Sequence, residues 1–249
     1  MKKLATLILI CCYVVAQGQH KETRKIEAHT AIAVSTGIDV IYIQSNKNEA
    51  IIACENKNHI DLLLTTVKAG TLEIRYRPNS SVSSKKPTKV TVYANGPLSS
   101  AKVSASGTLT LNNALKASTF KLEASSSGKI ITQQIEAAKI TIEASSSGKI
   151  KTDLQAVNVA IEASSASAIQ IAGKADNIRV AMSSSATVDL PQMEIGALVI
   201  EGSSLSSLTF YTAASLKNKL SSSAKVYFSK APIRITQNTL SSGGQFIKK

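Results

Sequence analysis

The sequence is poor in residues that cross-link a fold or stack on a ligand. It has no tryptophan, 4% aromatic residues and three cysteines in 249 residues. Cys11 and Cys12 lie in an apolar N-terminal run, so Cys54 stands alone in the rest of the chain and cannot form an internal disulfide. We interpret Cys54 as a small buried apolar residue, with an intermolecular bridge or a reactive thiol as the alternative.

Catalytic and metal-binding motifs are also missing. His20, His29 and His59 lack the spacing of a metal site, and we interpret them as solvated surface residues. No Gly-x-Ser-x-Gly motif and no phosphate-binding or dinucleotide-binding glycine motif occurs. Three aspartates fall in different repeats without a shared register: Asp153, Asp176 and Asp189. We therefore predict no enzyme, no catalytic or metal-ligating residues and no cofactor.

Acidic residues are few relative to basic ones. The chain has 29 Lys and Arg against 16 Asp and Glu, and without Lys2 and Lys3 the balance is 27 − 16 = +11. This excess favours contact with anionic envelope polymers or membrane surfaces. Nucleic acid is not expected as a partner, because aromatics are scarce and basic residues cluster no further than pairs such as Lys85-Lys86.

No apolar run is long enough to span a bilayer, which takes roughly 20 residues. Lys2 and Lys3 precede an apolar stretch at 4–16, and Ala16-Gln17-Gly18 fits a cleavage site. We predict a signal peptide at 1–18 and export to the periplasm, the outer membrane surface or the medium. Whether Cys11 carries a lipid stays open, since Ile10 stands where a small residue is usual.

What the sequence does contain is a repeat of about twenty residues. The octapeptide Glu-Ala-Ser-Ser-Ser-Gly-Lys-Ile occurs at 123–130 and again at 143–150. Counted from its glycine, equivalent positions are 107, 128, 148, 167, 186, 206, 224 and 244. So regular a period predicts stacked coils that bury a shared core.

Apolar residues two positions apart recur around this anchor, as in half-buried strands. Two positions after the anchor lie Leu109, Ile130, Ile150, Ile169, Val188, Leu208, Val226 and Phe246. We predict an all-β fold, a right-handed parallel β-helix with coils of about 20 residues, taking the hand from parallel crossovers in general. Residues 101–249 form the regular repeats and 19–100 an irregular N-terminal β cap of one β-solenoid domain, 19–249.

Small residues join the two strands of each coil and are interpreted as tight turns, not as nucleophiles. Gly128 and Gly148 are candidates for a positive φ, although later coils carry Ser or Ala at this position. A glutamate column precedes the turns, at Glu123, Glu143, Glu162 and Glu201. We expect an exposed face of mixed charge, with Lys129 and Lys149 in the next strand. A Ca²⁺ ladder is the alternative.

The chain resembles the head-GIN domain family, which carries the label of an autotransporter adhesin head. The resemblance rests on Gly-Ile-Asp-Val at 37–40, on 67–74, on the repeated Ser-Ser-Gly turns and on the closing segment 226–232. It covers about residues 24–246 and implies a β-helical fold and export in a Gram-negative-type envelope. Ser or Ala replaces Gly at most turns, and Ser229 stands where Gly is usual.

We therefore expect an adhesin-like or envelope structural protein that presents a repetitive face to a surface partner. Envelope polysaccharide, a membrane surface or a surface protein are the candidate partners, and an exposed terminal coil would allow a homo-oligomer. The alternative is a carbohydrate-active β-helix enzyme, a lyase or hydrolase of envelope or extracellular glycans. The ligand-binding residues stay unknown at this stage.

Overall fold

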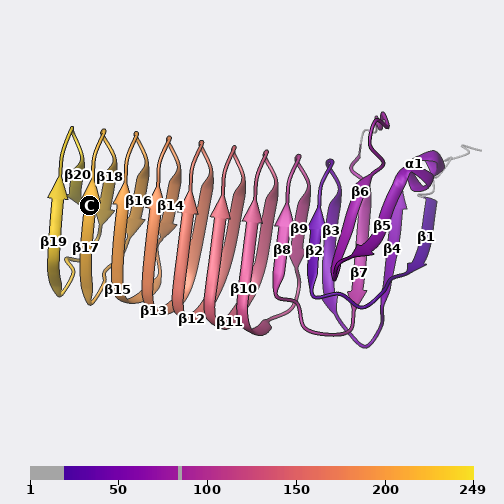
Figure 1. Ribbon diagram of the computed structural model, residues 1–249, viewed down its shortest axis with the longest axis horizontal. Helices are drawn as coiled ribbons and strands as arrows, with labels where there is room; N and C mark the ends of the chain where they lie inside the picture. Colours follow the sequence, from indigo (N-terminus) through magenta and orange to yellow (C-terminus); the bar gives the residue numbers. More distant parts are fainter. Residues whose placement is uncertain (1–19, 84–85) are drawn as a thin grey trace, which may run out of the picture.

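A computed structural model describes residues 20–83 and 86–249, and the signal peptide expected at 1–18 lies outside these residues. The described chain is nearly all β, with twenty strands and one short helix, α1 (Lys57–Leu62). Figure 1 shows the strands stacked side by side in one elongated column. Among the described residues, no helix is long and apolar enough to cross a membrane.

Parallel strands about twenty residues apart in sequence build the regular part, so the predicted β-solenoid is confirmed. In β11 and β12, for example, Ile130 lies opposite Ile150 and Ile142 opposite Ile161. The strands of this part are β8 (Ser100–Val103), β9 (Thr108–Leu111), β10 (Leu115–Ala124), β11 (Lys129–Ala144), β12 (Lys149–Ala163), β13 (Ala168–Met182), β14 (Thr187–Leu190), β15 (Met193–Gly202), β16 (Ser207–Phe210), β17 (Ser215–Leu220), β18 (Lys225–Phe228), β19 (Arg234–Leu240) and β20 (Gln245–Lys248).

The predicted apolar columns fill the interior. Ile130, Ile150, Ile169 and Val188 stack above one another and are at most 2% exposed. A single coil would expose its apolar residues to water, and the adjacent coils bury them, so the stability of one coil depends on its neighbours.

Each serine turn is a tight turn with two consecutive left-handed residues. In the turn 125–128, the Gly128 amide donates to the Ser125 carbonyl at 2.8 Å, and Ser126 and Ser127 have φ of 47° and 61°. These values define a type I′ turn. The Ser127 amide donates to the Ser146 carbonyl of the next coil at 2.9 Å, so successive turns are bonded together.

The expectation of a positive φ at Gly128 and Gly148 is wrong. Both positions face inward, where a Cβ on Gly128 would lie 2.7 Å from the Val103 carbonyl oxygen. Crowding against the neighbouring coil therefore requires glycine there. In later coils the same inward position accepts a small side chain, as in Ser167 and Ala186, which are at most 1% exposed.

The N-terminal part forms the predicted cap, but its strands are not stacked in chain order. β2 pairs in parallel with both β6 and β8, and β3 with both β7 and β9. The first coil is thus inserted between strands that come later. The strands are β1 (His20–Lys25), β2 (Ala31–Val34), β3 (Asp39–Gln44), β4 (Glu49–Cys54), β5 (Leu63–Lys68), β6 (Thr71–Tyr76) and β7 (Lys89–Ala94).

Antiparallel strands close this end of the column. β5 pairs with β6, β4 with β7 and β1 with β4, each antiparallel. The outermost strand, β1, has the sequence His-Lys-Glu-Thr-Arg-Lys and is largely exposed. Charged side chains on an edge strand discourage further pairing.

Two of the histidines are buried in this cap, so their interpretation as solvated surface residues is wrong. His29 is 4% and His59 is 7% exposed. Their rings meet the edges of Tyr42 and Tyr76, with centroids 5.9 and 6.5 Å apart. His20 is exposed, and Cys54 is free and 3% exposed, as interpreted.

Candidate functional site

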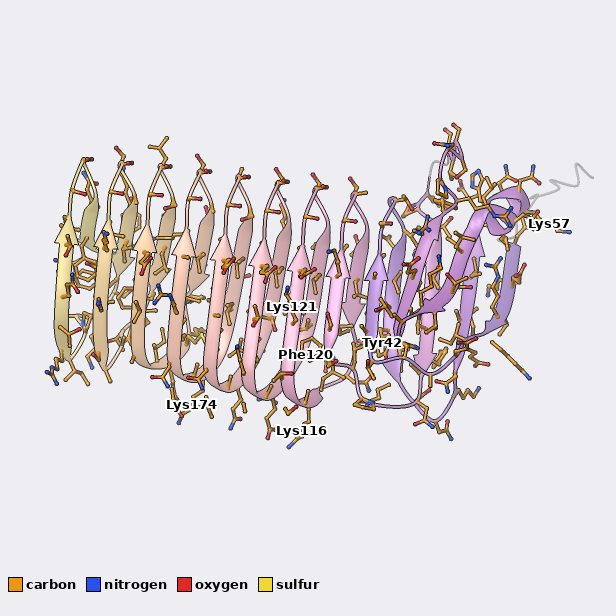
Figure 2. All side chains as sticks on the ribbon, viewed as in Figure 1. Tyr42, Lys57, Lys116, Phe120, Lys121 and Lys174 are labelled. Atoms are coloured by element: carbon orange, nitrogen blue, oxygen red, sulfur yellow. The ribbon has the colours of Figure 1, made fainter. Side chains whose placement is uncertain are left out.

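The solenoid presents two outward faces, one on each side of the serine turns. We call the outward residues of the strand segments before each turn the Glu face, and those of the segments after each turn the Lys face. Both faces follow from strand alternation, because each outward residue separates two inward apolar ones. Figure 2 shows Lys121 on the body of the column, and Lys116 and Lys174 at the corner opposite the turns.

Ion pairs neutralise much of the Glu face. Lys121 contacts the carboxylates of both Glu123 and Glu143, the latter at 3.0 Å, and Lys102 lies 3.0 Å from Glu123. Farther along, Arg179 lies 2.7 Å from Glu201. The predicted face of mixed charge is therefore observed. The basic partners of these glutamates lie on the Glu face, either in the same coil or in a neighbouring one. Lys129 and Lys149 are not among them.

The ion pairs shift the pKa values of Glu123 and Lys121 in this cluster. Partial burial raises the pKa of the Glu123 carboxyl, but hydrogen bonds from Lys121 and Lys102 outweigh burial and hold it below its usual value. Hydrogen bonds to Glu123 and Glu143 raise the pKa of Lys121. The charges of these groups therefore stabilise one another.

A groove of about 750 Å³ runs beside the glutamate column. Its walls combine the glutamates with the first serine of each turn, such as Ser125, Ser145 and Ser164. Within 20–83 and 86–249, no three His, Cys, Asp or Glu side chains converge as a metal site requires. In place of the Ca²⁺ ladder, lysines pair with Glu123 and Glu143 and Arg179 pairs with Glu201, whereas Glu162 has no ion pair with another described residue.

The Lys face carries lysines that lack such partners. Lys129 lies directly opposite Lys149 in the parallel ladder, and Lys151 lies opposite Ile131. All three lysines are exposed, and none forms an ion pair with another described residue. We call Lys129, Lys149 and Lys151 the Lys patch. Like charges placed opposite each other destabilise a sheet, so this arrangement favours an external anion.

Hydroxyl and amide groups border the Lys patch. Thr108 and Thr110 lie beside Lys129 and Ile131 on one side, and Gln170 lies beside Lys151 on the other. One coil farther out on each side stand the carboxylates of Asp39 and Asp189. The three lysines of the Lys patch thus lie in two adjacent coils, and Lys225 continues the column of Lys129 and Lys149 four coils farther along.

The three aspartates singled out in the sequence do not lie at one site. Asp153 and Asp176 line different hollows, of about 370 and 550 Å³, near the corner opposite the turns. Asp189 lies in β14 on the Lys face. General acid–base cleavage of a glycosidic bond needs two carboxyl groups facing one site, within about 10 Å of each other. These three aspartates do not provide that pair.

The sequence contains a signal for the Lys patch that composition alone does not reveal. In Lys149-Ile150-Lys151 the isoleucine is an inward column residue, so both lysines must point outward. Lys129 occupies the same column one coil earlier. Combining the repeat with strand alternation would therefore have located the cluster.

The comparisons with known proteins agree with this architecture. Residues 28–153 and 121–232 match the family described as "Putative auto-transporter adhesin, head GIN domain". No curated protein matches the chain. A solved structure titled a putative lipid binding protein, from Parabacteroides distasonis, superposes with a TM-score of 0.80 at 17% identity, covering 94% of this chain and 98% of that one.

Two further solved structures titled putative adhesins are similar over nearly their full length. The protein from Parabacteroides merdae has a TM-score of 0.72 at 16% identity, with coverage of 94% and 97%. The protein from Bacteroides fragilis has a TM-score of 0.68 at 16% identity, with coverage of 94% and 97%. At such identities the likeness concerns the fold. The sequence match, which extends over most of the chain, shows that this protein belongs to the head GIN domain family of putative auto-transporter adhesins.

Proposed function

We propose that the protein is exported, is not an enzyme, and binds anionic polysaccharide of the cell envelope through the Lys patch. The observation that carries this proposal is the pairing of Lys129 with Lys149 in the sheet without a neutralising carboxylate among the described residues. On the Glu face, by contrast, Lys121 is neutralised by two carboxylates. A polyanion would supply the missing charge.

The geometry of the Lys patch suits a linear polymer. Adjacent coils are separated by about 4.8 Å, so Lys129 and Lys149 form a short row along the column axis. Thr108 extends that row, and Thr110 and Gln170 flank Ile131 and Lys151 in the neighbouring row; all three side chains can hydrogen-bond to sugar hydroxyls. Charge attracts the polymer, and the polar flanks give it additional contacts.

Replacing the Lys patch tests this proposal. Lys129→Gln/Lys149→Gln/Lys151→Gln removes three charges from the patch. The matched control, Lys57→Gln/Lys68→Gln/Lys139→Gln, removes three exposed charges elsewhere. We expect the patch variant to elute from an immobilised sulfated polysaccharide at clearly lower salt than wild type, and the control to elute near wild type.

Equal shifts in both variants would show that net charge, not the patch, attracts the polymer. Vesicles of phosphatidylglycerol form the second arm of the experiment, because one solved relative is titled a putative lipid binding protein. Patch-dependent binding to vesicles, with none to polysaccharide, would replace the polymer with a membrane surface as the partner.

A further inference from the structure

The cap contains a basic hollow at the edge of the molecule that carries the serine turns. There β2 leads into the turn 35–38, and β6, which pairs with β2, leads into the turn 77–80. Figure 1 shows that the loop after β6 leaves the column at this edge. A hollow of about 480 Å³ lies between the two turns, and both Arg75 and Arg77 line it.

The two arginines lie on the same side of their segment. Strand alternation places Arg75 on the outward side of β6, because its neighbours Ile74 and Tyr76 are buried. Arg77 follows directly after the strand, is exposed and lines the same hollow. Two residues of extended backbone span roughly 7 Å. Two guanidinium groups at this spacing can bind one and the same anion.

The positive charge of this hollow is only partly neutralised. The Nε atom of Arg75 lies 3.4 Å from a carboxylate oxygen of Glu73, and its Nη1 atom lies 3.5 Å from the Tyr76 carbonyl oxygen. Arg77 forms no ion pair with another described residue. None of the described residues that line the hollow is acidic. An external anion would therefore complete the neutralisation.

Hydrogen bonds hold the walls of the hollow in place. The Arg77 amide donates to the Leu62 carbonyl at 2.9 Å, and the Arg77 carbonyl accepts from the amide and the hydroxyl of Ser80, at 3.3 and 2.6 Å. On the opposite wall, the Thr36 hydroxyl accepts from the Tyr76 amide at 3.1 Å. Thr36 has a φ of 63°, which is uncommon for a β-branched residue. Because the walls are joined in this way, less ordering is needed when a ligand binds.

A phosphate monoester is the anion that suits two arginines best. A guanidinium group binds a carboxylate or a phosphate through paired hydrogen bonds. The two oxygens of a carboxylate are matched by one arginine, whereas a phosphate monoester has three terminal oxygens and up to two negative charges. The side chains of Ser35 and Asn79 add neutral donors to the wall of the hollow. Pro78 and Val82 offer apolar contacts to the esterified part of the ligand.

We propose that this hollow binds the phosphate group of a phosphate ester, with Arg75 and Arg77 both donating to it. A soluble sugar phosphate and a phospholipid headgroup present this same chemistry. The site goes beyond the proposed function and does not depend on it. β6 continues the Glu face through β2 and β8, so the hollow and the Lys patch lie on different sides of the turns.

Calorimetric titration of the full chain with glycerol phosphate tests the site. We expect Arg77→Gln to weaken binding by about tenfold, because charge-assisted hydrogen bonds are lost. Arg75→Gln/Arg77→Gln should abolish binding. The matched control, Arg179→Gln/Arg234→Gln, removes two exposed guanidinium groups elsewhere and should bind as wild type does. Acetate, which carries a carboxylate, should bind clearly more weakly than glycerol phosphate. Circular dichroism checks that each variant is folded.

Vesicles of phosphatidylcholine with added phosphatidic acid form the second arm, because the headgroup of phosphatidic acid is a phosphate monoester. Vesicle binding that Arg75→Gln/Arg77→Gln abolishes would identify a lipid headgroup as the source of the phosphate. Binding of glycerol phosphate without binding of vesicles would identify a soluble ester. Binding of neither probe, equal affinities for acetate and glycerol phosphate, or an equal loss in the control variant would each overturn the proposal.

Discussion

At the scale of single residues, the cap contains two buried tyrosines in contrasting surroundings. The hydroxyl of Tyr76 lies 2.6 Å from the Thr88 hydroxyl, and both residues are buried. The hydroxyl of Tyr42 is buried without a hydrogen-bond partner among the described residues. Burial also raises the pKa of Tyr42 to about 12. The two sites therefore respond in opposite ways to loss of the hydroxyl.

We predict that Tyr42→Phe leaves the free energy of unfolding unchanged or raises it by about 1 kcal/mol, because it removes a polar group buried without a partner. Tyr76→Phe should lower it by about 1–2 kcal/mol, because the buried Thr88 hydroxyl loses its partner. Urea unfolding followed by circular dichroism at pH 7 measures both. A larger loss for Tyr42→Phe than for Tyr76→Phe would contradict this assignment.

Burial of Tyr42 also predicts that the free energy of unfolding decreases at alkaline pH. A folded pKa above the unfolded value of about 10 contributes stability that is complete below pH 10 and is lost as the pH rises towards 12. Wild type should therefore lose stability between these values faster than Tyr42→Phe does.

Residue-level features were predictable where they repeat and not where they occur once. The inward columns, Ile130 and Ile150 among them, follow directly from alternation around the anchor. The sequence predicted a positive φ at Gly128, whereas the residues with positive φ are Ser126 and Ser127. All three residues are small, so their size does not indicate which of them adopts the left-handed conformation. The buried His29 belongs to the cap, where no repeat indicates the inward side.

At the scale of elements, the ladder on the Glu face makes stability depend on pH. Because pairing lowers the folded pKa of Glu123, its contribution is present above the unfolded pKa of about 4.3 and is lost as the pH falls through the lower folded value. Pairing raises the pKa of Lys121, so that contribution is present below about pH 10.4 and is lost above it.

We predict that Glu123→Gln lowers the free energy of unfolding at pH 7 by at most about 1 kcal/mol, since water screens these partly exposed pairs. The difference from wild type should disappear near pH 3. Glu162→Gln is the matched control, because Glu162 occupies the same column without an ion pair to any other described residue. Thermal melts across pH 3–7 measure both variants. A pH-independent deficit in Glu123→Gln would argue against the ion-pair explanation.

The sequence predicted the elements better than the contacts between them. Strand positions and register follow from the twenty-residue period, but ion-pair partners depend on which coils are neighbours. Lys102 reaches Glu123 across one coil, and Lys121 reaches it along the same strand. The prediction that Lys129 and Lys149 accompany the glutamates was based on spacing within a single coil. Both lysines lie on the Lys face instead.

At the scale of the whole molecule, a cap at one end makes the protection of backbone amides against hydrogen exchange differ along the column. In a stack of coils, each coil is stabilised by its contacts with adjacent coils, so a coil with one neighbour unfolds locally more readily than a coil with two. β12 is paired along both edges, with β11 and β13, whereas β19 is paired along one edge, with β17.

We predict that backbone amides of β19 and β20 exchange hydrogen fastest among the regular strands, and those of β11–β13 slowest, in dilute monomeric protein. Hydrogen exchange read by mass spectrometry measures this gradient. Uniform protection along the column at high dilution would contradict the nearest-neighbour explanation.

The overall shape was largely predictable, and the order of strands in the cap was not. The regular period extends from about residue 101 to the end of the described chain and fixes the stacking there. The cap lacks a period, and its strand runs fit several arrangements equally well by alternation alone. Insertion of β2 and β3 between later strands depends on long-range packing that single-segment patterns do not reveal.

That inserted coil also bears on the order in which the chain can fold. β2 and β3 receive their second neighbours only when β8 and β9 are present, so residues 31–44 must wait until about residue 111 is available. A chain threaded through a translocation pore from its N-terminus would therefore keep its first coil incomplete while more than sixty further residues emerge. The fold thus delays its own closure, and this favours a chain that crosses a membrane before it becomes compact.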